Sequence, residues 1–304
     1  RYTHRTDGMT QQVCTSTPLV HFSRDSCHKV LIMNFEGKTT VVTGAANGIG
    51  AALARRFHAA GARVVVADRD AKNLEAIEKE LNAIRPDSAF AVIADIGSEA
   101  GNVALIDAAR AKFGFIDLFY ANAGVGMGTD LESTDEETWN TAMNINLHSH
   151  RWAAKHLMGE WLAAGEGYFC STASAAGLLS QIGSGPYSVT KHGAVAFAEW
   201  LSITYGDRGV RVTTLCPQGV NTNMLNPPDA VPGIGNTDGG SAVKASGVVL
   251  EPAEVADIVY NTIVAEKFLV MPHPEVHTYE KRKVDDRDRW LSGMRRLQAR
   301  VAGG

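Results

Sequence analysis

Tyr187 and Lys191 are the residues whose types and spacing point most directly to chemistry. Two residues four apart on a helix lie on the same face, one turn from each other. Tyrosine has a pKa of about 10 and is a poor base at pH 7, but a neighbouring ammonium favours the phenolate. Lowering that pKa to about 7–8 takes roughly 3–4 kcal/mol, at about 1.36 kcal/mol per unit. The pair predicts a tuned general acid/base, although a solvated surface pair on a helix has the same spacing.

The elements that must position this pair alternate along the chain. Short β-branched segments are separated by Ala-rich segments with apolar residues at helical spacing, an order that requires right-handed crossovers and gives a parallel sheet covered on both faces. We predict strands at 39–43, 63–67, 90–94, 118–121, 168–170, 210–216 and 268–271, and helices at 49–60, 73–84, 102–113, 135–164 and 187–205. The predicted fold class is α/β, a single-domain, Rossmann-like doubly wound parallel sheet of about seven strands with helices on both faces.

Composition narrows the class of protein. The chain has 304 residues, of which 45% are hydrophobic and 20% charged, and its formal net charge is −4. These values are ordinary for a soluble globular protein and give no basic field for nucleic acid. No apolar segment approaches the roughly 20 residues of a membrane span, and the four cysteines lack metal-type spacing. We therefore expect no metal site, no nucleic-acid partner, no membrane partner and a reducing, cytoplasmic location.

A glycine-containing turn follows the first predicted strand, in the segment Thr43-Gly44-Ala45-Ala46-Asn47-Gly48-Ile49-Gly50. Glycines let the backbone approach a pyrophosphate, and a helix N-terminus offers free N–H groups and a positive dipole end. Turns need glycine for many reasons, so the position between a strand and a helix is what favours a dinucleotide site. The candidate cofactor-binding residues in this turn are Gly44, Asn47, Gly48, Ile49 and Gly50.

Asp68 ends the second predicted strand, 18 residues after Gly50. This position fits the acidic residue that accepts hydrogen bonds from the adenine ribose hydroxyls. A 2′-phosphate there meets like charge, and at ~5 Å and an effective dielectric of ~20 each charge pair costs about 3 kcal/mol. We predict NAD, with NADP less favoured. Arg69 favours NADP instead, because it has the charge to bind a phosphate. Asp95 and Ile96, after the third strand, are candidates for the adenine ring.

Further motifs continue this pattern: Asn122-Ala123-Gly124 after the fourth strand, Asn144-Ile145-Asn146-Leu147, and Ser174 thirteen residues before Tyr187. In this order and at these spacings, residues 35–272 resemble the short-chain dehydrogenase/reductase (SDR) family, in its shorter subfamily. The resemblance implies an oxidoreductase that transfers a hydride between a nicotinamide cofactor and a secondary alcohol or ketone. The chain departs from the family pattern at Ala121, where a second Asn is frequent, and at Gln218, which interrupts the usual Pro-Gly pair.

The resemblance implies a four-residue catalytic site. Tyr187 is expected to be the general acid/base, and Ser174 the hydroxyl that polarises the substrate oxygen. Lys191 is expected to lower the pKa of Tyr187 and bind the nicotinamide ribose, and Asn146 to hold a water that links Lys191 to solvent. The alternatives in the same segments are Ser171, Thr172 and Asn144. Further cofactor contacts are expected from Asn122, Ala123, Gly124, Tyr187, Lys191, Pro217, Gly219, Val220 and Thr222.

The chain divides into three predicted parts. Residues 1–32 begin at Arg rather than Met, show no clear period, and are interpreted as an N-terminal extension or an expression remnant. Residues 33–272 form the dinucleotide-binding and catalytic domain. Residues 273–304 form a helical tail, with Trp290 and Leu297 among the apolar residues that predict an amphipathic helix over 275–301.

The segment 223–249 follows the sixth predicted strand and is interpreted as a substrate-covering loop, because long loops in compact domains are often lids. Its apolar cover is expected from Met224, Leu225, Val231 and Ile234. The pocket lining is expected from Leu178, Leu179, Gln181 and Ile182. Few charges occur in these segments, which favours a small, apolar alcohol or ketone as substrate.

The resemblance also implies a homotetramer or homodimer in which the helices at 135–164 and 187–205 pair across the interface. Two other functions stay open at this point. One is a 3-oxoacyl thioester reductase, which would more often use NADPH. The other is a non-catalytic NAD(P)-binding sensor on the same fold, against which the complete set of Ser174, Tyr187 and Lys191 argues.

Overall fold

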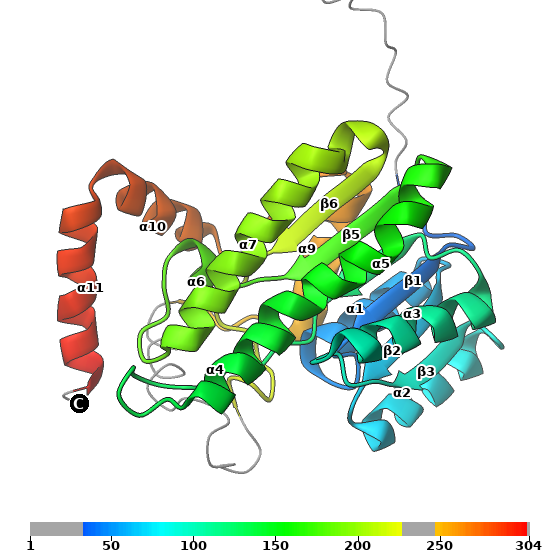
Figure 1. Ribbon diagram of the computed structural model, residues 1–304, viewed down its shortest axis with the longest axis horizontal. Coiled ribbons are helices and arrows are strands. Elements are labelled where there is room, and N and C mark those ends of the chain that lie inside the picture. The colour runs from blue at the N-terminus through cyan, green and yellow to red at the C-terminus, as the bar shows by residue number, and fades with distance from the viewer. Residues whose placement is uncertain (1–32, 227–246, 303–304) are drawn as a thin grey trace, which may run out of the picture. The chain divides into compact units, whose positions relative to one another are not determined.

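The structure is a computed structural model that describes residues 33–226 and 247–302 (Figure 1). The predicted N-terminal extension lies outside the described residues, as do Val231 and Ile234 of the predicted covering loop.

The described strands form one seven-stranded parallel sheet in the order β3-β2-β1-β4-β5-β6-β7, which confirms the predicted fold class. The strands are β1 (Thr39–Thr43), β2 (Arg63–Asp68), β3 (Ala89–Ile93), β4 (Leu118–Ala121), β5 (Gly167–Thr172), β6 (Val210–Leu215) and β7 (Leu269–Val270). Val41 of β1 lies between Val65 of β2 and Phe119 of β4, and every pairing is parallel. The carboxyl ends of all strands therefore meet at one edge, where such sheets bind ligands.

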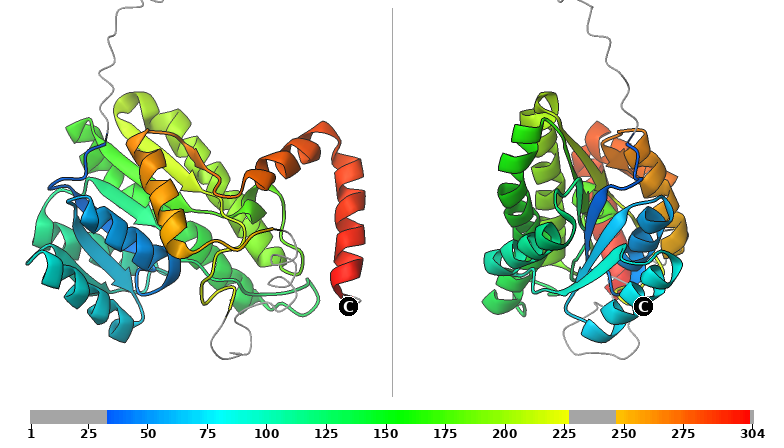
Figure 2. Two further views of the ribbon diagram at one scale, coloured as in Figure 1. Left: turned by 180° about the vertical axis from the view of Figure 1, so that it is seen from behind. Right: turned by 90° about the vertical axis from the view of Figure 1, so that its right-hand side faces the viewer.

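Helices cover both faces of this sheet (Figure 2). Val42 and Val64 face a core shared with α1 and α9, whereas Val41 and Val65 face a core shared with α3, α5 and α7. This alternation follows from the two-residue period of a strand, and both faces are apolar because both are buried. The helices are α1 (Gly48–Ala59), α2 (Ala71–Ile84), α3 (Glu99–Phe113), α4 (Glu136–Met143), α5 (Ser149–Ala164), α6 (Ala175–Leu178), α7 (Gly185–Tyr205), α9 (Pro252–Val264), α10 (Pro274–Asp285) and α11 (Arg287–Ala302).

The helix predicted over 135–164 contains a π-helix, η1 (Asn144–His148), between α4 and α5. Asp135 caps α4, and its carboxylate accepts a hydrogen bond from the Thr138 N–H at 2.8 Å. A π turn adds a residue to the helix and is found frequently at functional sites. Here it buries both Ile145 and Asn146.

Two parts of the C-terminal region differ from the prediction. Helix α9 was not predicted, although Pro252 in its first turn and the capping box of Glu251 and Glu254 are local start signals. The tail forms two helices rather than one, because Asp286 is extended between α10 and α11 and accepts a hydrogen bond from the Arg289 N–H at 2.9 Å. None of the helices within 33–226 and 247–302 combines the length and apolarity needed to span a bilayer.

Candidate active site

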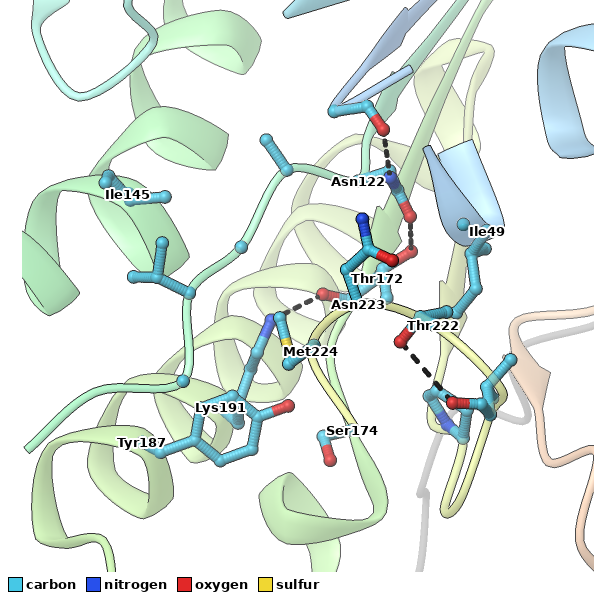
Figure 3. A pocket seen from close by; sticks show the side chains of 18 of the residues that line it. Ile49, Asn122, Ile145, Thr172, Ser174, Tyr187, Lys191, Thr222, Asn223 and Met224 are labelled. Atoms are coloured by element: carbon cyan, nitrogen blue, oxygen red, sulfur yellow. Dashed lines mark hydrogen bonds between the residues drawn. The ribbon is translucent and has the colours of Figure 1, made fainter. Parts of the chain in front are cut away.

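A cavity of about 380 Å³ is lined by the loops that follow the strands at the carboxyl edge of the sheet. It brings together most of the predicted site residues, namely Gly44, Asn47, Gly48, Ile49, Asp68, Arg69, Asp95, Ile96, Asn122, Ala123, Gly124, Ser174, Tyr187, Lys191, Pro217, Val220 and Thr222. Three other predicted residues, Gly50, Asn146 and Gly219, lie outside the lining. Figure 3 shows Ser174, Tyr187 and Lys191 near one another in this cavity.

Tyr187 stands in the first turn of α7, and Ser184 fixes the start of that helix. The Ser184 hydroxyl accepts a hydrogen bond from the Tyr187 N–H at 3.3 Å and donates one to the Met127 carbonyl at 3.0 Å. Pro186 follows at a position where its missing N–H costs nothing. The loop after β4 and the start of α7 are thereby joined, which holds Tyr187 at the cavity.

Ser174 lines the cavity, and its hydroxyl differs in its partners from those of the two alternatives. It caps the short helix α6, where its Oγ accepts a hydrogen bond from the Ala176 N–H at 3.1 Å. The alternative Ser171 donates to the Thr214 Oγ1 at 3.0 Å in the sheet and lies outside the cavity lining. The other alternative, Thr172, lines the cavity, but its hydroxyl donates to the Asn122 Oδ1 at 2.9 Å.

Burial controls the acid/base properties of Tyr187 and Lys191. It raises the pKa of Tyr187, while a hydrogen bond from Ser174 lowers it. It lowers the pKa of Lys191 to about 8, because an ammonium removed from water loses its hydration. Lys191 lies on the same face of α7 as Tyr187, with its Nζ 5.6 Å from the centre of the tyrosine ring. Without a bound cofactor, desolvation of the phenol therefore outweighs the predicted lowering of its pKa.

Lys191 is held in one position by the end of β5. Its side chain is 2% exposed, and its Nζ donates a hydrogen bond to the Thr172 carbonyl at 2.9 Å. Gly124 makes room for it, since a Cβ at that glycine would lie 3.2 Å from the Lys191 Nζ and 3.2 Å from the Asn146 Oδ1. A side chain at Gly124 would thus displace two predicted catalytic residues.

Asn146 lies behind the cavity wall and braces the loop after β4. Its Oδ1 accepts from the Val125 N–H at 2.8 Å, and its Nδ2 donates to the Val125 carbonyl at 2.9 Å and to the Thr190 Oγ1 at 3.2 Å. Asn144, the alternative, is half-buried and outside the lining. The Asn146 side chain therefore holds Gly124–Val125 in place, and its predicted contact with a water stays a prediction.

Asn122 joins three strands at the cavity edge. Its Nδ2 donates to the Thr43 carbonyl of β1 at 3.0 Å, and its Oδ1 accepts from Thr172 of β5 at 2.9 Å. Because Asn122 itself directly follows β4, one side chain connects the ends of β1, β4 and β5.

The N-terminus of α1 has the properties of a phosphate site. Asn47 makes no side-chain capping hydrogen bond there, and the first turn contains no acidic residue. By contrast, α2 is capped by Asp70 and α3 by Ser98. The uncapped N–H groups and the dipole of α1 favour an anion, and Asn47, Gly48 and Ile49 line the cavity. The residues present therefore fit the pyrophosphate of a dinucleotide.

Asp68 holds the turn before α1 while also lining the cavity. Its Oδ2 accepts from the Ala46 N–H at 3.1 Å, and its Oδ1 accepts from the Arg69 N–H at 2.7 Å and the Asp70 N–H at 3.1 Å. The carboxylate is thus fixed at the end of β2 in the place where a ribose reader is expected.

The predicted substrate lining between Ser174 and Tyr187 is largely wrong. Gln181 lines the cavity, but Leu178, Leu179 and Ile182 do not. Leu178 packs on a small apolar cluster that includes Val195, and its carbonyl and that of Leu179 accept hydrogen bonds from Lys283 of α10. This contact between α10 and the segment after Ser174 was not predicted.

Several lining residues were not among the predicted ones. They are Ala67, Ala94, Val125, Gly126, Ile145, Ala173, Ala175, Ala176, Ser184 and Gln218. Val125 and Gly126 directly continue the Asn122–Gly124 motif, so their nearness to that motif was the available signal. Met224 and Leu225, predicted as part of the covering loop, do line the cavity.

Comparison with known proteins decides the family. The family model described as short chain dehydrogenase matches residues 38–230. The chain belongs to the short-chain dehydrogenases. This assignment confirms the resemblance drawn from the order and spacing of the motifs.

This short-chain dehydrogenase is similar to several named dehydrogenases and solved structures. It is 31% identical over 249 residues to 1-deoxy-11-beta-hydroxypentalenate dehydrogenase of Streptomyces avermitilis, covering 81% of this chain and 88% of the relative. The solved short-chain dehydrogenase/reductase of Burkholderia phymatum, in complex with NAD, is 28% identical with a TM-score of 0.76, covering 84% and 96% of the two chains. An alcohol dehydrogenase from Thermococcus sibiricus, complexed with 5-hydroxy-NADP, is 26% identical with a TM-score of 0.67, covering 78% and 96%.

Proposed function

We propose that this short-chain dehydrogenase interconverts a secondary alcohol and a ketone, with Tyr187 as general acid/base and NAD as the preferred cofactor. The observation that carries the proposal is that Ser174, Tyr187 and Lys191 share one cavity with the uncapped N-terminus of α1. Such a cavity combines an acid/base, a hydroxyl donor and an anion site, which a sensor that only binds a dinucleotide does not need.

A bound nicotinamide supplies the hydride acceptor or donor. In alcohol oxidation the Tyr187 Oη takes the proton of the substrate hydroxyl, and in ketone reduction it returns that proton. The Ser174 hydroxyl donates a hydrogen bond to the same substrate oxygen and orients it. Lys191, when protonated, stabilises the phenolate form of Tyr187 across the 5.6 Å between its Nζ and the ring. A positioned acid/base of this kind contributes about 10²–10⁴-fold to the rate.

The cofactor preference rests on charge at the end of β2. The Asp68 carboxylate is fixed by three backbone N–H groups and lines the cavity. A ribose with free hydroxyls gains hydrogen bonds there, whereas a 2′-phosphate meets like charge. Arg69 also lines the cavity, so the preference for NAD is expected to be a ratio rather than an exclusion.

We infer the substrate class from the lining residues contributed by the loop after β4, the segment before α7 and the segment after β6. Val125, Met224 and Leu225 are apolar, and Gln181 and Ser184 supply neutral polar groups. A charged substrate would lack a partner among these residues. We therefore expect a small, mainly apolar secondary alcohol or ketone.

The proposal is tested by a spectrophotometric screen of graded secondary alcohols with NAD⁺ and NADP⁺, comparing the wild type with Tyr187→Phe. The expected result is turnover that is faster with NAD⁺ and falls about 10²–10⁴-fold in the variant, while NADH binding persists. Undiminished activity of Tyr187→Phe would contradict the assigned acid/base. Faster turnover with NADP⁺ would contradict the assigned cofactor.

A further inference from the structure

His273 connects the C-terminal region to the cavity. It directly precedes α10, and it is 2% exposed. Its Nδ1 accepts a hydrogen bond from the Gln218 N–H at 3.1 Å, and its Nε2 donates one to the Gly219 carbonyl at 3.0 Å. A backbone N–H only donates and a carbonyl only accepts, so both partners require the neutral tautomer with hydrogen on Nε2.

These two bonds hold the segment Pro217–Val220, here termed the β6 loop because it follows β6. Pro217, Gln218 and Val220 of this loop line the cavity. On its other side, the Gly219 carbonyl also accepts from the Leu250 N–H at 3.0 Å. The loop is thus held by the backbone of Leu250, by the ring of His273, and by the Ala175 N–H, which donates a hydrogen bond to the Pro217 carbonyl at 2.8 Å.

The β6 loop is the part of the chain that departs from the family pattern at Gln218. Backbone groups in a buried cavity wall need hydrogen-bond partners, since an unpaired buried N–H or carbonyl costs about 1–3 kcal/mol. His273 supplies both a donor and an acceptor from one rigid ring. A side chain with only one of these functions would leave one backbone group without that partner.

We propose that His273 is a positioning residue that holds the β6 loop in the conformation that receives the nicotinamide half of the cofactor. This inference rests on the proposed function, because it takes the cavity to bind a nicotinamide dinucleotide. The adenine half is expected at the loops after β2 and β3, where Asp68 and Asp95 line the cavity. Loss of His273 should therefore weaken the hold on one half of the cofactor and not on the other.

The experiment compares the binding of NADH and of ADP-ribose, which lacks the nicotinamide, to the full chain by calorimetry. His273→Phe keeps a flat ring and removes both hydrogen bonds. We expect NADH to bind about tenfold more weakly to this variant, as the loss of about 1.4 kcal/mol implies, with ADP-ribose affinity unchanged within about twofold. His277→Phe is the matched control, because His277 is exposed on the same helix, and it should bind both ligands like the wild type.

Two conservative variants separate positioning from packing. Asn places an acceptor near the position of Nδ1, and Gln places a donor near the position of Nε2, so each can restore one of the two bonds. We expect His273→Asn and His273→Gln to recover part of the NADH affinity lost in His273→Phe. Hydrogen exchange without ligand adds a direct readout. The backbone N–H of Gln218 should exchange faster in His273→Phe and be protected again in His273→Asn.

The outcomes are distinct. Equal loss of NADH and ADP-ribose affinity would overturn the positioning role and would indicate a general loss of structure. Wild-type NADH affinity in His273→Phe would overturn it too, because His273 would then have no effect on the cofactor. If His273→Phe does not fold, His273→Asn carries the same comparison of the two ligands. A wild type that binds neither ligand would refute the proposed function, and the inference with it. If the wild type binds both ligands and only the variants depart from the expected result, the role of His273 alone is refuted.

Discussion

At the scale of single residues, the site combines two groups whose charged forms are both disfavoured by burial. Tyr187 and Lys191 are removed from water by the same cavity wall, so the phenol keeps its proton more firmly and the ammonium loses its proton more easily. The Tyr-x-x-x-Lys spacing predicted that the two residues share a helix face. It did not predict these directions, because the residues that enclose Lys191 come from outside α7, from the end of β5 and the loop after β4.

Ser174 is expected to set the pH dependence of alcohol oxidation. Oxidation requires deprotonated Tyr187, so kcat/KM rises with pH until the pKa of Tyr187 is passed. Because the hydrogen bond of Ser174 lowers that pKa, Ser174→Ala should move the rising limb to higher pH as well as reduce the rate. The pH profile of kcat/KM with the best alcohol of the screen measures this. If the rising limb of kcat/KM in Ser174→Ala stays at the wild-type pH, Ser174 does not act on the pKa of Tyr187.

Lys191 is expected to reduce the stability of the fold. Its pKa is about 8 in the folded chain against 10.5 normally, which corresponds to a destabilisation of up to about 3 kcal/mol below pH 8. This cost declines as pH rises from about 8 to 10.5, because over that range the unfolded chain binds the proton and the folded chain does not. Lys191→Met removes this cost of about 3 kcal/mol, but it also removes the hydrogen bond to the Thr172 carbonyl, which contributes about 1 kcal/mol. The free energy of unfolding at pH 7 should therefore rise by about 2 kcal/mol.

Urea denaturation at pH 7 and near pH 10 tests this prediction, and the difference between Lys191→Met and the wild type should shrink at the higher pH. Lys72→Met, at an exposed position of α2, is the control and should leave stability unchanged within about 0.5 kcal/mol. A less stable Lys191→Met protein at pH 7 would show that the lost hydrogen bond outweighs the desolvation of the ammonium.

At the scale of elements, we expect cofactor binding to depend on the uncapped start of α1 and on the glycines at and before that start. Gly48 has φ +54°, and a Cβ there would lie 2.9 Å from the Thr222 Cγ2. Gly48→Ala should therefore strain the turn and displace Thr222, and we expect NADH affinity to fall about tenfold or more. Fluorescence titration of NADH measures the effect.

Gly159→Ala provides the control for that change, because Gly159 lies within α5 and a Cβ there would meet nothing within 4 Å. It should bind NADH like the wild type and gain slightly in stability from the better helix propensity of alanine. Equal affinity of Gly48→Ala and the wild type would contradict the assignment of this turn to the pyrophosphate.

The sequence predicted the elements well where local period and composition determine them. Strands β1 and β4 match their predicted bounds, and the helices that follow β1, β2 and β3 begin within three residues of the prediction. The π-helix at Asn144–His148 was not predictable, because its apolar spacing resembles that of an ordinary helix. The return of α10 to the loop after α6 was also missed, since Lys283 reads as a surface lysine in a charged tail and is in fact 8% exposed.

At the scale of the whole molecule, the outer face of α7 remains apolar in the single chain. Trp200 is 51% exposed and Ile203 is 84% exposed, beside the half-buried Phe197. Exposed apolar side chains that cluster on one helix indicate an interaction surface. This agrees with the predicted pairing of the helices at 135–164 and 187–205 between subunits, which stays a prediction, as does the cytoplasmic location.

Ile203→Asp is expected to shift the protein to a smaller assembly, because a carboxylate in an apolar interface is costly to bury. Light scattering coupled to gel filtration measures the mass. Ile84→Asp is the matched control, since Ile84 is 72% exposed at the end of α2, and it should leave the mass unchanged. An unchanged mass in Ile203→Asp would place the interface elsewhere or show a monomer.

The strand order has a consequence for synthesis on the ribosome. In the middle of the sheet, Thr40 of β1 pairs with Val64 on one side and with Leu118, 78 residues later, on the other. At ~5–20 residues per second, β1 then waits about 4–16 s for its second neighbour, with one β-branched edge open to other nascent chains. The yield of native protein should consequently depend more on the rate of translation and on chaperones that shield this edge than on the final stability of the fold.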